Sequence, residues 1–67
     1  MLYLIGDFAT ATGLTPRALR LYDARGLLPA RRDPTNGHRY YRDEDLLPAR
    51  RVAFLRALGF SLSDIAD

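Results

Sequence analysis

The chain contains no cysteine, no lysine and only one histidine among its 67 residues. The missing cysteines exclude a disulfide framework, a thiolate metal site and a cysteine redox switch. His38 has basic and aromatic neighbours, so it could not hold a metal without several carboxylate partners. The sequence also has no glycine-rich phosphate loop and no carboxylate pair in a plausible cleft. We therefore expect no metal, no cofactor and no catalytic residue, and we expect that the chain is not an enzyme.

Long apolar runs are missing as well. The apolar start of the chain, residues 1–5, is too short for a signal peptide or a membrane span. We expect a cytoplasmic protein with no membrane partner. A chain of 67 residues makes one small domain, here residues 1–67, near the lower size limit for a self-sufficient core.

Basic charge is concentrated in the first two thirds of the chain. All ten basic residues are arginine, and the formal net charge is +2. Residues 1–42 hold seven arginines against three acids, whereas residues 43–67 hold three arginines against five acids. Arginine offers a planar donor fork that matches a phosphate or a guanine edge. A GC-rich genome would also favour arginine over lysine, so the uneven distribution of charge is the more informative observation.

Residues 15–25 are predicted to form a helix whose two ends can be recognised in the sequence. Thr15 can cap the N-terminus, because its hydroxyl accepts a hydrogen bond from a first-turn N–H. Pro16 suits the first helical position, where no backbone donor is needed. Gly26 follows the last turn and allows the chain to leave the helix through a left-handed residue.

The two sides of this helix differ in character. Ala18, Leu19 and Tyr22 share one side, and Arg17 and Arg20 share another. One side can therefore pack while the other presents two guanidinium groups. A helix that inserts into a DNA groove needs this arrangement.

A shorter helix is predicted immediately before it, over residues 5–12. Ile5, Phe8, Ala9 and Thr12 form its apolar stripe. Leu4, at the cap position, offers no side-chain acceptor, so Asp7 in the first turn must help through the helix dipole. A helix, a glycine-containing turn and a second helix with a basic face make a helix-turn-helix pattern. An ordinary helical hairpin is the alternative at this point.

A β-hairpin, called the wing below, is predicted over residues 31–41. Short β-compatible runs flank the turn dipeptides Asp33-Pro34 and Asn36-Gly37, where Gly37 supplies a positive φ. Two strands alone are marginally stable, so we expect the wing to pack on the helices through Tyr41 and Leu28. Alternation then leaves Tyr40 at the surface. Arginines on both strands, beside a basic helix, favour nucleic-acid binding over a merely solvated loop.

Two further helices are predicted after the wing. The third is capped by Asp43 and ended by Gly59, and Pro48 requires either a kink or a start delayed to Asp45. Ser61 and Asp64 resemble a capping box for a fourth helix, which either is very short or begins a longer protein. The expected apolar face of the third helix is Leu46, Ala49, Ala53, Phe54, Ala57 and Leu58. We expect Arg50, Arg51 and Arg56 on its solvated face, with a phosphate contact from one of them as the alternative.

Five segments, taken in order, resemble the amino-terminal domain of MerR-family transcription regulators. They read IGDFA at 5–9, GLTPRALRLYD at 13–23, GLLP at 26–29, GHRYY at 37–41 and LGFSL at 58–62. Each segment alone is weak evidence, but the ordered set is highly specific and covers nearly the whole chain. Residues 33–34 and 54–56 are most similar to the multidrug-sensing branch of the family. The chain departs from the family at Leu4, where a capping Ser or Thr is usual, at His38 and at Pro48.

The resemblance implies a mainly α fold with a small β-hairpin, the winged helix-turn-helix. It implies sequence-specific binding of double-stranded promoter DNA, with helix 15–25 in the major groove and wing 31–41 on the backbone or minor groove. Family members act as homodimers that distort the operator for RNA polymerase. The family's dimerisation helix and effector region are absent from this sequence. We expect the 67-residue chain to be monomeric, because its apolar positions are needed for its own core.

The resemblance also assigns roles by position. Arg17 and Arg20 become groove and phosphate contacts, Tyr22 a backbone contact and Arg39 the wing arginine. The full set of expected DNA-binding residues is Thr15, Pro16, Arg17, Arg20, Tyr22, Arg31, His38, Arg39 and Tyr40.

One alternative of a different class remains open. A small winged helix can also act alone, either bending DNA as an excisionase-like factor does or docking on another protein. A reading frame that ends at Asp67 would favour this alternative. A frame that continues into a long heptad-like helix would favour the regulator.

Overall fold

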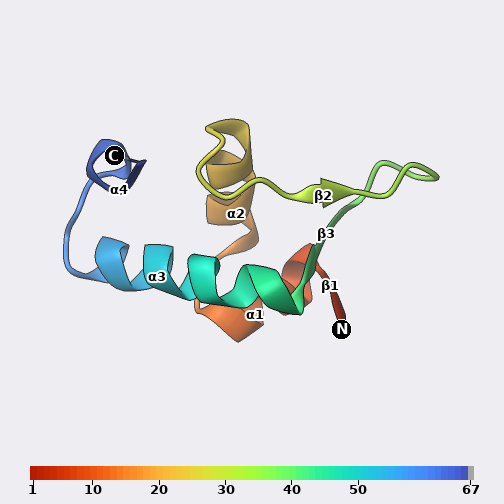
Figure 1. The fold of residues 1–67 in the computed structure, drawn as a ribbon, viewed down its shortest axis with the longest axis horizontal. Coiled ribbons are helices and arrows are strands. Elements are labelled where there is room, and N and C mark those ends of the chain that lie inside the picture. The colour runs from red at the N-terminus through yellow and green to blue at the C-terminus, as the bar shows by residue number, and fades with distance from the viewer. Residues whose placement is uncertain (67) are drawn as a thin grey trace.

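The computed structural model describes residues 1–66, which form helices around a small antiparallel sheet (Figure 1). The wing tip and the C-terminal helix lie at opposite ends of a body measuring 37 × 20 × 19 Å (Figure 1). The elements are, in order, β1 (Leu2–Leu4), α1 (Ile5–Thr12), α2 (Pro16–Ala24), β2 (Arg31–Arg32), β3 (Arg39–Arg42), the 3₁₀ helix η1 (Asp43–Asp45), α3 (Leu46–Ala57) and α4 (Leu62–Ala66).

The first two helices begin and end where the sequence predicts. Leu4 is extended and provides no side-chain cap for α1, which ends at Gly13 with φ +76°. The Thr15 hydroxyl accepts the Ala18 N–H at 3.1 Å, and Pro16 is the first residue of α2. Gly26 follows α2 with φ +70°. The helix-turn-helix prediction is confirmed.

The sheet has three strands rather than the two predicted. Its order is β1-β3-β2, with Tyr3 opposite Tyr41 and Arg32 opposite Arg39. The prediction missed β1 because a three-residue strand has no periodicity of its own and exists only through its pairing with β3.

Directly opposed residues of an antiparallel pair lie on one face of the sheet, so the register defines two faces. The inner face carries Tyr3, Tyr41, Arg32 and Arg39, and the outer face carries Leu2, Leu4, Arg31, Tyr40 and Arg42.

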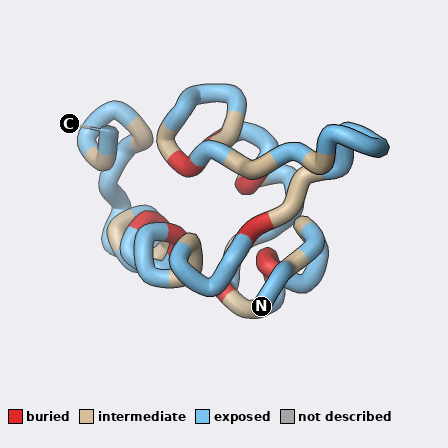
Figure 2. Tube along the Cα trace, turned by 45° about the vertical axis from the view of Figure 1, so that its right-hand side comes forward, coloured by how far each residue is buried: buried red, intermediate tan, exposed pale blue. Residues whose placement is uncertain are grey.

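The core lies where the two helices of the helix-turn-helix meet the inner face and α3. Phe8 and Tyr41 are fully buried and stack with ring centroids 4.1 Å apart. Leu28 is also buried, so the expectation that the wing packs through Tyr41 and Leu28 is confirmed. Figure 2 shows the buried residues on the interior sides of the elements, with the wing tip exposed. The remaining core residues are Ala9, Leu19, Tyr22, Ala49 and Val52.

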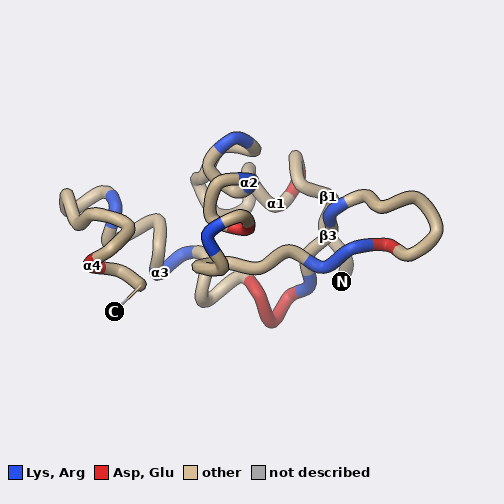
Figure 3. The backbone as a smooth tube through the Cα atoms, turned by 90° about the horizontal axis from the view of Figure 1, so that it is seen from above, with Lys and Arg blue, Asp and Glu red and all other residues tan. Residues whose placement is uncertain are grey.

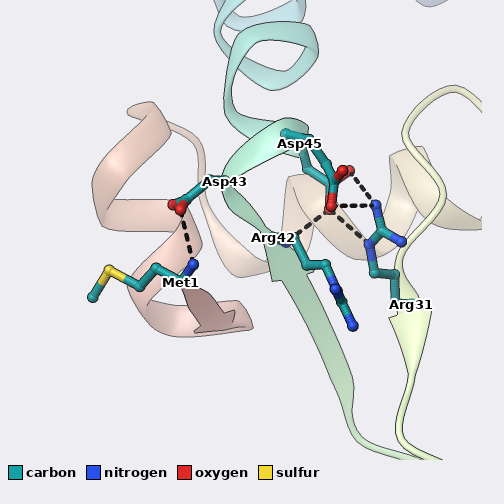
Figure 4. Close-up of polar contacts among 6 residues, drawn as sticks. Met1, Arg31, Arg42, Asp43 and Asp45 are labelled. Atoms are coloured by element: carbon teal, nitrogen blue, oxygen red, sulfur yellow. Dashed lines mark hydrogen bonds and ion pairs between the residues drawn. The ribbon is translucent and has the colours of Figure 1, made fainter.

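The start of α3 is delayed, as Pro48 requires. Residues 43–45 form η1, and Pro48 then falls in the first turn of α3, where no helical hydrogen bond is lost. The prediction that Asp43 caps this helix is wrong. Its carboxylate accepts a hydrogen bond from the N-terminal ammonium at 2.8 Å, and Asp45 accepts the Arg42 N–H at 2.8 Å instead (Figure 4).

The predicted apolar face of α3 is only partly correct. Ala49 is buried, but the second buried residue is Val52, which the prediction omitted. Phe54 and Leu58 are 64% and 60% exposed, and Ala57 is exposed as well. The helix is apolar on several sides, so periodicity alone could not select the side that packs. The monomer was expected because the apolar positions are needed for the core, and that reason is wrong for the exposed Phe54, Ala57 and Leu58. The oligomeric state itself stays a prediction.

The last described helix has the predicted capping box. The Ser61 N–H donates to Asp64 at 3.2 Å, and the Asp64 N–H donates to the Ser61 hydroxyl at 3.1 Å. The predicted end of this helix at Asp67 lies outside the described residues. No helix within residues 1–66 has the length and apolar character needed to cross a membrane.

Candidate nucleic-acid interface

The surface of α2 presents two arginines that no acidic group neutralises. Arg17 and Arg20 are exposed, and within residues 1–66 neither side chain forms an ion pair. Leu19 and Tyr22, on the packing side of the same helix, are 0% and 5% exposed. The capped N-terminus and the buried side together fix the direction in which the two guanidinium groups point, away from the core.

The wing lies beside this basic side of α2. A hollow between them is lined by Leu4, Ile5, Arg20, Gly37, His38 and Arg39. The structure therefore brings together three of the expected contact residues, Arg20 from α2 and His38 and Arg39 from the wing. Seen from above in Figure 3, basic residues occur on α2 and on both strands of the wing.

The wing tip holds its shape through its own side chains. The Asp33 carboxylate accepts the Thr35 N–H at 2.8 Å, and the Asn36 side chain accepts the His38 N–H at 2.9 Å. Gly37 has φ +73°, a conformation that other residues adopt only with strain. These turns present His38 at the exposed end of the hairpin.

Asp23 joins the wing to α2 on the inner face of the sheet. Its carboxylate accepts the Ala30 N–H at 3.0 Å and the Arg39 Nε–H at 2.9 Å, and Arg32 Nη2 lies 3.5 Å away. Burial of the carboxylate opposes its ionisation. The Ala30 N–H and the two arginines outweigh that effect and keep the pKa of Asp23 below its usual value. Neither Asp23 nor Arg32 was among the expected site residues.

Arg31 lies on the opposite face of the sheet from Arg39, and its expected role as a DNA contact stays a prediction. Its Nε and Nη2 atoms donate to Asp45 at 3.1 and 3.2 Å (Figure 4). A carboxylate oxygen of Glu44 lies 3.4 Å from Arg31 Nη2. The hydrogen bond to Asp45 raises the pKa of Arg31 although partial burial lowers it. Arg31 therefore ties the wing to the start of α3, on the outer face. The residue beside it in the sequence, Arg32, is the one that shares a face with Arg39.

The two tyrosines of the expected set lie in different surroundings. Tyr22 is 5% exposed and its ring packs in the core, and its expected role as a backbone contact stays a prediction. Tyr40 is half-buried on the outer face, directly opposite Arg31 and away from Arg39. Alternation along β3 had already separated Tyr40 from Tyr41, and the register now shows that Tyr40 lies on the face turned away from Asp23.

The start of α2 completes the site. Thr15 and Pro16 are both exposed, and the Thr15 hydroxyl is already engaged by the Ala18 N–H. No three acidic or histidine side chains of residues 1–66 are gathered where they could hold a metal ion. The arrangement offers donors and positive charge, which suit a polyanionic ligand.

Comparison with known proteins identifies the family. A model of the MerR HTH family regulatory proteins matches residues 3–67. The chain belongs to the MerR family. The transcriptional regulator SkgA of Caulobacter vibrioides is 44% identical over 63 residues, which are 94% of this chain and 25% of that protein. The transcriptional activator TipA of Streptomyces coelicolor is 41% identical over 66 residues, which are 98% of this chain and 26% of that protein.

Solved structures of MerR-family regulators share the fold. A family member from Bacillus cereus superposes with a TM-score of 0.84 at 39% identity, covering 98% of this chain and 49% of the other. HiNmlR, described as a MerR family regulator lacking the sensor domain and bound to promoter DNA, gives a TM-score of 0.83 at 37% identity, covering 98% and 52%. The winged helix-turn-helix prediction is confirmed. This MerR-family chain spans about a quarter of the length of the SkgA and TipA proteins.

Proposed function

We propose that this MerR-family domain binds promoter DNA sequence-specifically, with α2 in the major groove and the wing on the adjacent backbone or minor groove. The observation that carries the proposal is the exposure of Arg17 and Arg20 without any acidic partner among residues 1–66. Arg20 shares a hollow with the wing residues His38 and Arg39. A B-DNA major groove accommodates one α-helix, and an arginine fork matches the guanine edge. The promoter complex of HiNmlR, a relative with the same fold, supports the binding of promoter DNA.

The proposal extends to the whole protein. The relatives are longer than this chain, and we propose that a following helix joins two copies into a homodimer that distorts its operator for RNA polymerase. Two domains held together gain affinity through effective concentration, because the second half-site is bound intramolecularly. A cytoplasmic location and membership in the multidrug-sensing branch stay predictions from the sequence.

The test begins by selecting binding sites from a randomised duplex library, followed by fluorescence anisotropy on the selected duplex at several salt concentrations. We expect Arg20→Ala to weaken binding by roughly 1–3 kcal/mol and to relax base preference at one position if Arg20 reads a guanine. Arg39→Ala should weaken all sequences alike and reduce the salt slope by about one unit.

The matched control is Arg51→Ala. Arg51 is exposed on α3 and carries the same charge, so a mere loss of net positive charge should show equally in this variant. If Arg17→Ala and Arg20→Ala bind like the wild type, or if Arg51→Ala weakens binding as much as they do, the assignment of α2 to the groove is wrong.

A further inference from the structure

Asp23 is an acidic residue at the edge of a surface that should attract DNA. It lies one helical turn after Arg20 on α2, so the two side chains share a side of the helix. Its side chain is only 15% exposed, and its carboxylate lies within ion-pair distance of both wing arginines of the inner face. An acid in this position repels phosphate, and on charge alone its removal should strengthen DNA binding.

The geometry of its contacts gives Asp23 an effect opposite to simple repulsion of phosphate. The hydrogen bond from Arg39 uses Nε, and within residues 1–66 the two Nη groups of Arg39 donate no hydrogen bond. The Arg39 side chain is therefore held through its Nε–H, while the four N–H donors of its Nη groups remain for another anion. The Ala30 N–H binds the other carboxylate oxygen, which fixes the carboxylate itself.

The same contacts set the position of the wing relative to α2. Arg39 lines the hollow that also contains Arg20, and Arg32 is opposite Arg39 in the sheet. A carboxylate that holds both arginines thus fixes the distance between the groove helix and the wing. Because a long side chain ordered before binding loses less freedom on binding, this arrangement favours affinity.

We propose that Asp23 is a positioning residue that increases DNA affinity by holding Arg39 and Arg32 of the wing toward the same duplex that α2 contacts. The proposal rests on the DNA-binding function proposed above. Asp23 does not contact DNA itself; it acts through the two arginines, and the phosphates of the backbone are the ligands of those arginines.

The experiment measures duplex binding of the wild-type chain, Asp23→Asn and Asp7→Asn across a salt series. Asn keeps one acceptor oxygen for the Ala30 N–H, removes the charge, and replaces the oxygen that accepts from Arg39 with an NH2 group that cannot accept. We expect Asp23→Asn to bind about tenfold more weakly, with a smaller salt slope, because the wing arginines are no longer held. Asp7, an exposed acid in the first turn of α1, makes no side-chain ion pair within residues 1–66. Its replacement should leave affinity unchanged or slightly improve it.

A double-variant cycle tests whether Asp23 acts through the wing. If it does, Asp23→Asn should weaken binding much less in an Arg39→Ala background than in the wild type. Equal effects in both backgrounds would overturn the proposal, as would unchanged or tighter binding by Asp23→Asn. Failure of the wild-type chain to bind any duplex would instead overturn the proposed function.

A measurement on the wild type covers the case in which Asp23→Asn does not fold. Arginine Nε–H signals in nitrogen-15 NMR spectra report whether each Nε is engaged. The Arg39 signal should exchange slowly in the free protein and stay nearly unshifted when DNA is added, whereas the Arg17 signal should exchange fast when free. An Arg39 signal that behaves like that of Arg17, or that loses protection with DNA, would contradict the proposal.

Discussion

Removal of a single oxygen atom from the core should stabilise this domain. Tyr41 is fully buried, and its ring stacks on Phe8 at an interplanar angle of 2°. Its hydroxyl is buried with no hydrogen-bond partner among residues 1–66. Burial, followed by the nearby negative charge of Asp23, raises the pKa of Tyr41 and keeps the phenol neutral. A buried polar group without a partner costs about 1–3 kcal/mol.

Tyr41→Phe keeps the ring and its stack and removes only that cost. We expect the free energy of unfolding to rise by about 1 kcal/mol, the lower end of the range, because the oxygen also fills space. A change of this size raises Tm by about 4–8 °C in a domain of 60–100 residues. Urea denaturation followed by circular dichroism gives the free energy, and calorimetry gives Tm.

Two further variants make the result interpretable. Tyr40→Phe alters a half-buried tyrosine on the outer face and should change stability by less than about 0.5 kcal/mol. Tyr41→Ala should cost about 3–5 kcal/mol, which would show that the position belongs to the core. If Tyr41→Phe proves less stable than the wild type by more than about 0.5 kcal/mol, its hydroxyl has a partner and the reasoning is refuted.

Three other changes test local features by urea denaturation. Thr15→Ala should cost about 1 kcal/mol because it removes the cap on the Ala18 N–H, whereas Thr15→Ser should cost much less; equal losses would contradict the cap. Gly37→Ala should destabilise the domain by about 1–2 kcal/mol because φ of Gly37 is +73°. Gly6→Ala, in a helix and with equally open space for an added Cβ, should stabilise it by up to about 1 kcal/mol. A change of the same sign for both variants would refute the argument. Burial opposes ionisation of Asp45, but Arg31 and the Arg42 N–H outweigh that effect and lower the pKa of Asp45. The stability that the ionised carboxylate contributes is therefore present above the unfolded pKa of about 4 and is lost as pH falls through the lower folded value. Asp45→Asn should be destabilising at about pH 7 and nearly neutral at about pH 2, and an equal loss at both pH values would exclude this linkage.

The elements that the sequence predicts correctly are those specified by neighbouring residues. A cap, a proline and a terminal glycine define α2 within a span of 12 residues, 15–26, and the structure has the same boundaries within a residue. The Ser61 and Asp64 capping box is equally local. By contrast, β1 depends on pairing between Tyr3 and Tyr41, residues far apart in the sequence. No local signal marks such a strand, because its hydrogen bonds belong to a partner that the sequence pattern does not identify.

The packing side of α3 illustrates a second limit. Alanine, leucine and phenylalanine occur around much of this helix, so several stripes fit the helical period equally well. The structure buries Ala49 and Val52, which are three positions apart, and leaves Phe54 outside. Only the position of the neighbouring α1 and of the sheet decides between the stripes.

The sequence predicts that the site contains several arginines, but it does not predict which face of the sheet each of them occupies. Arg31 and Arg32 are adjacent and chemically identical, yet the register of β2 places them on opposite faces. Arg31 is bound by Asp45, whereas Arg32 joins Arg39 beside Asp23. Alternation would have separated the two arginines on any strand. Which of them faces α2 depended on the pairing with β3, and that pairing could not be read from composition.

These contacts divide the basic residues of the surface into two kinds. Arg17 and Arg20 carry charge that no acid within residues 1–66 offsets, so their attraction for a polyanion depends only on the orientation of α2. The wing arginines are each paired with a carboxylate, so the wing contributes less net attraction at long range than its sequence suggests. Its contribution must come at contact, where Arg39 can bind a second anion without leaving the first. Under the proposed function, α2 therefore makes the first encounter with DNA, and the ion pairs of the wing set the geometry that follows.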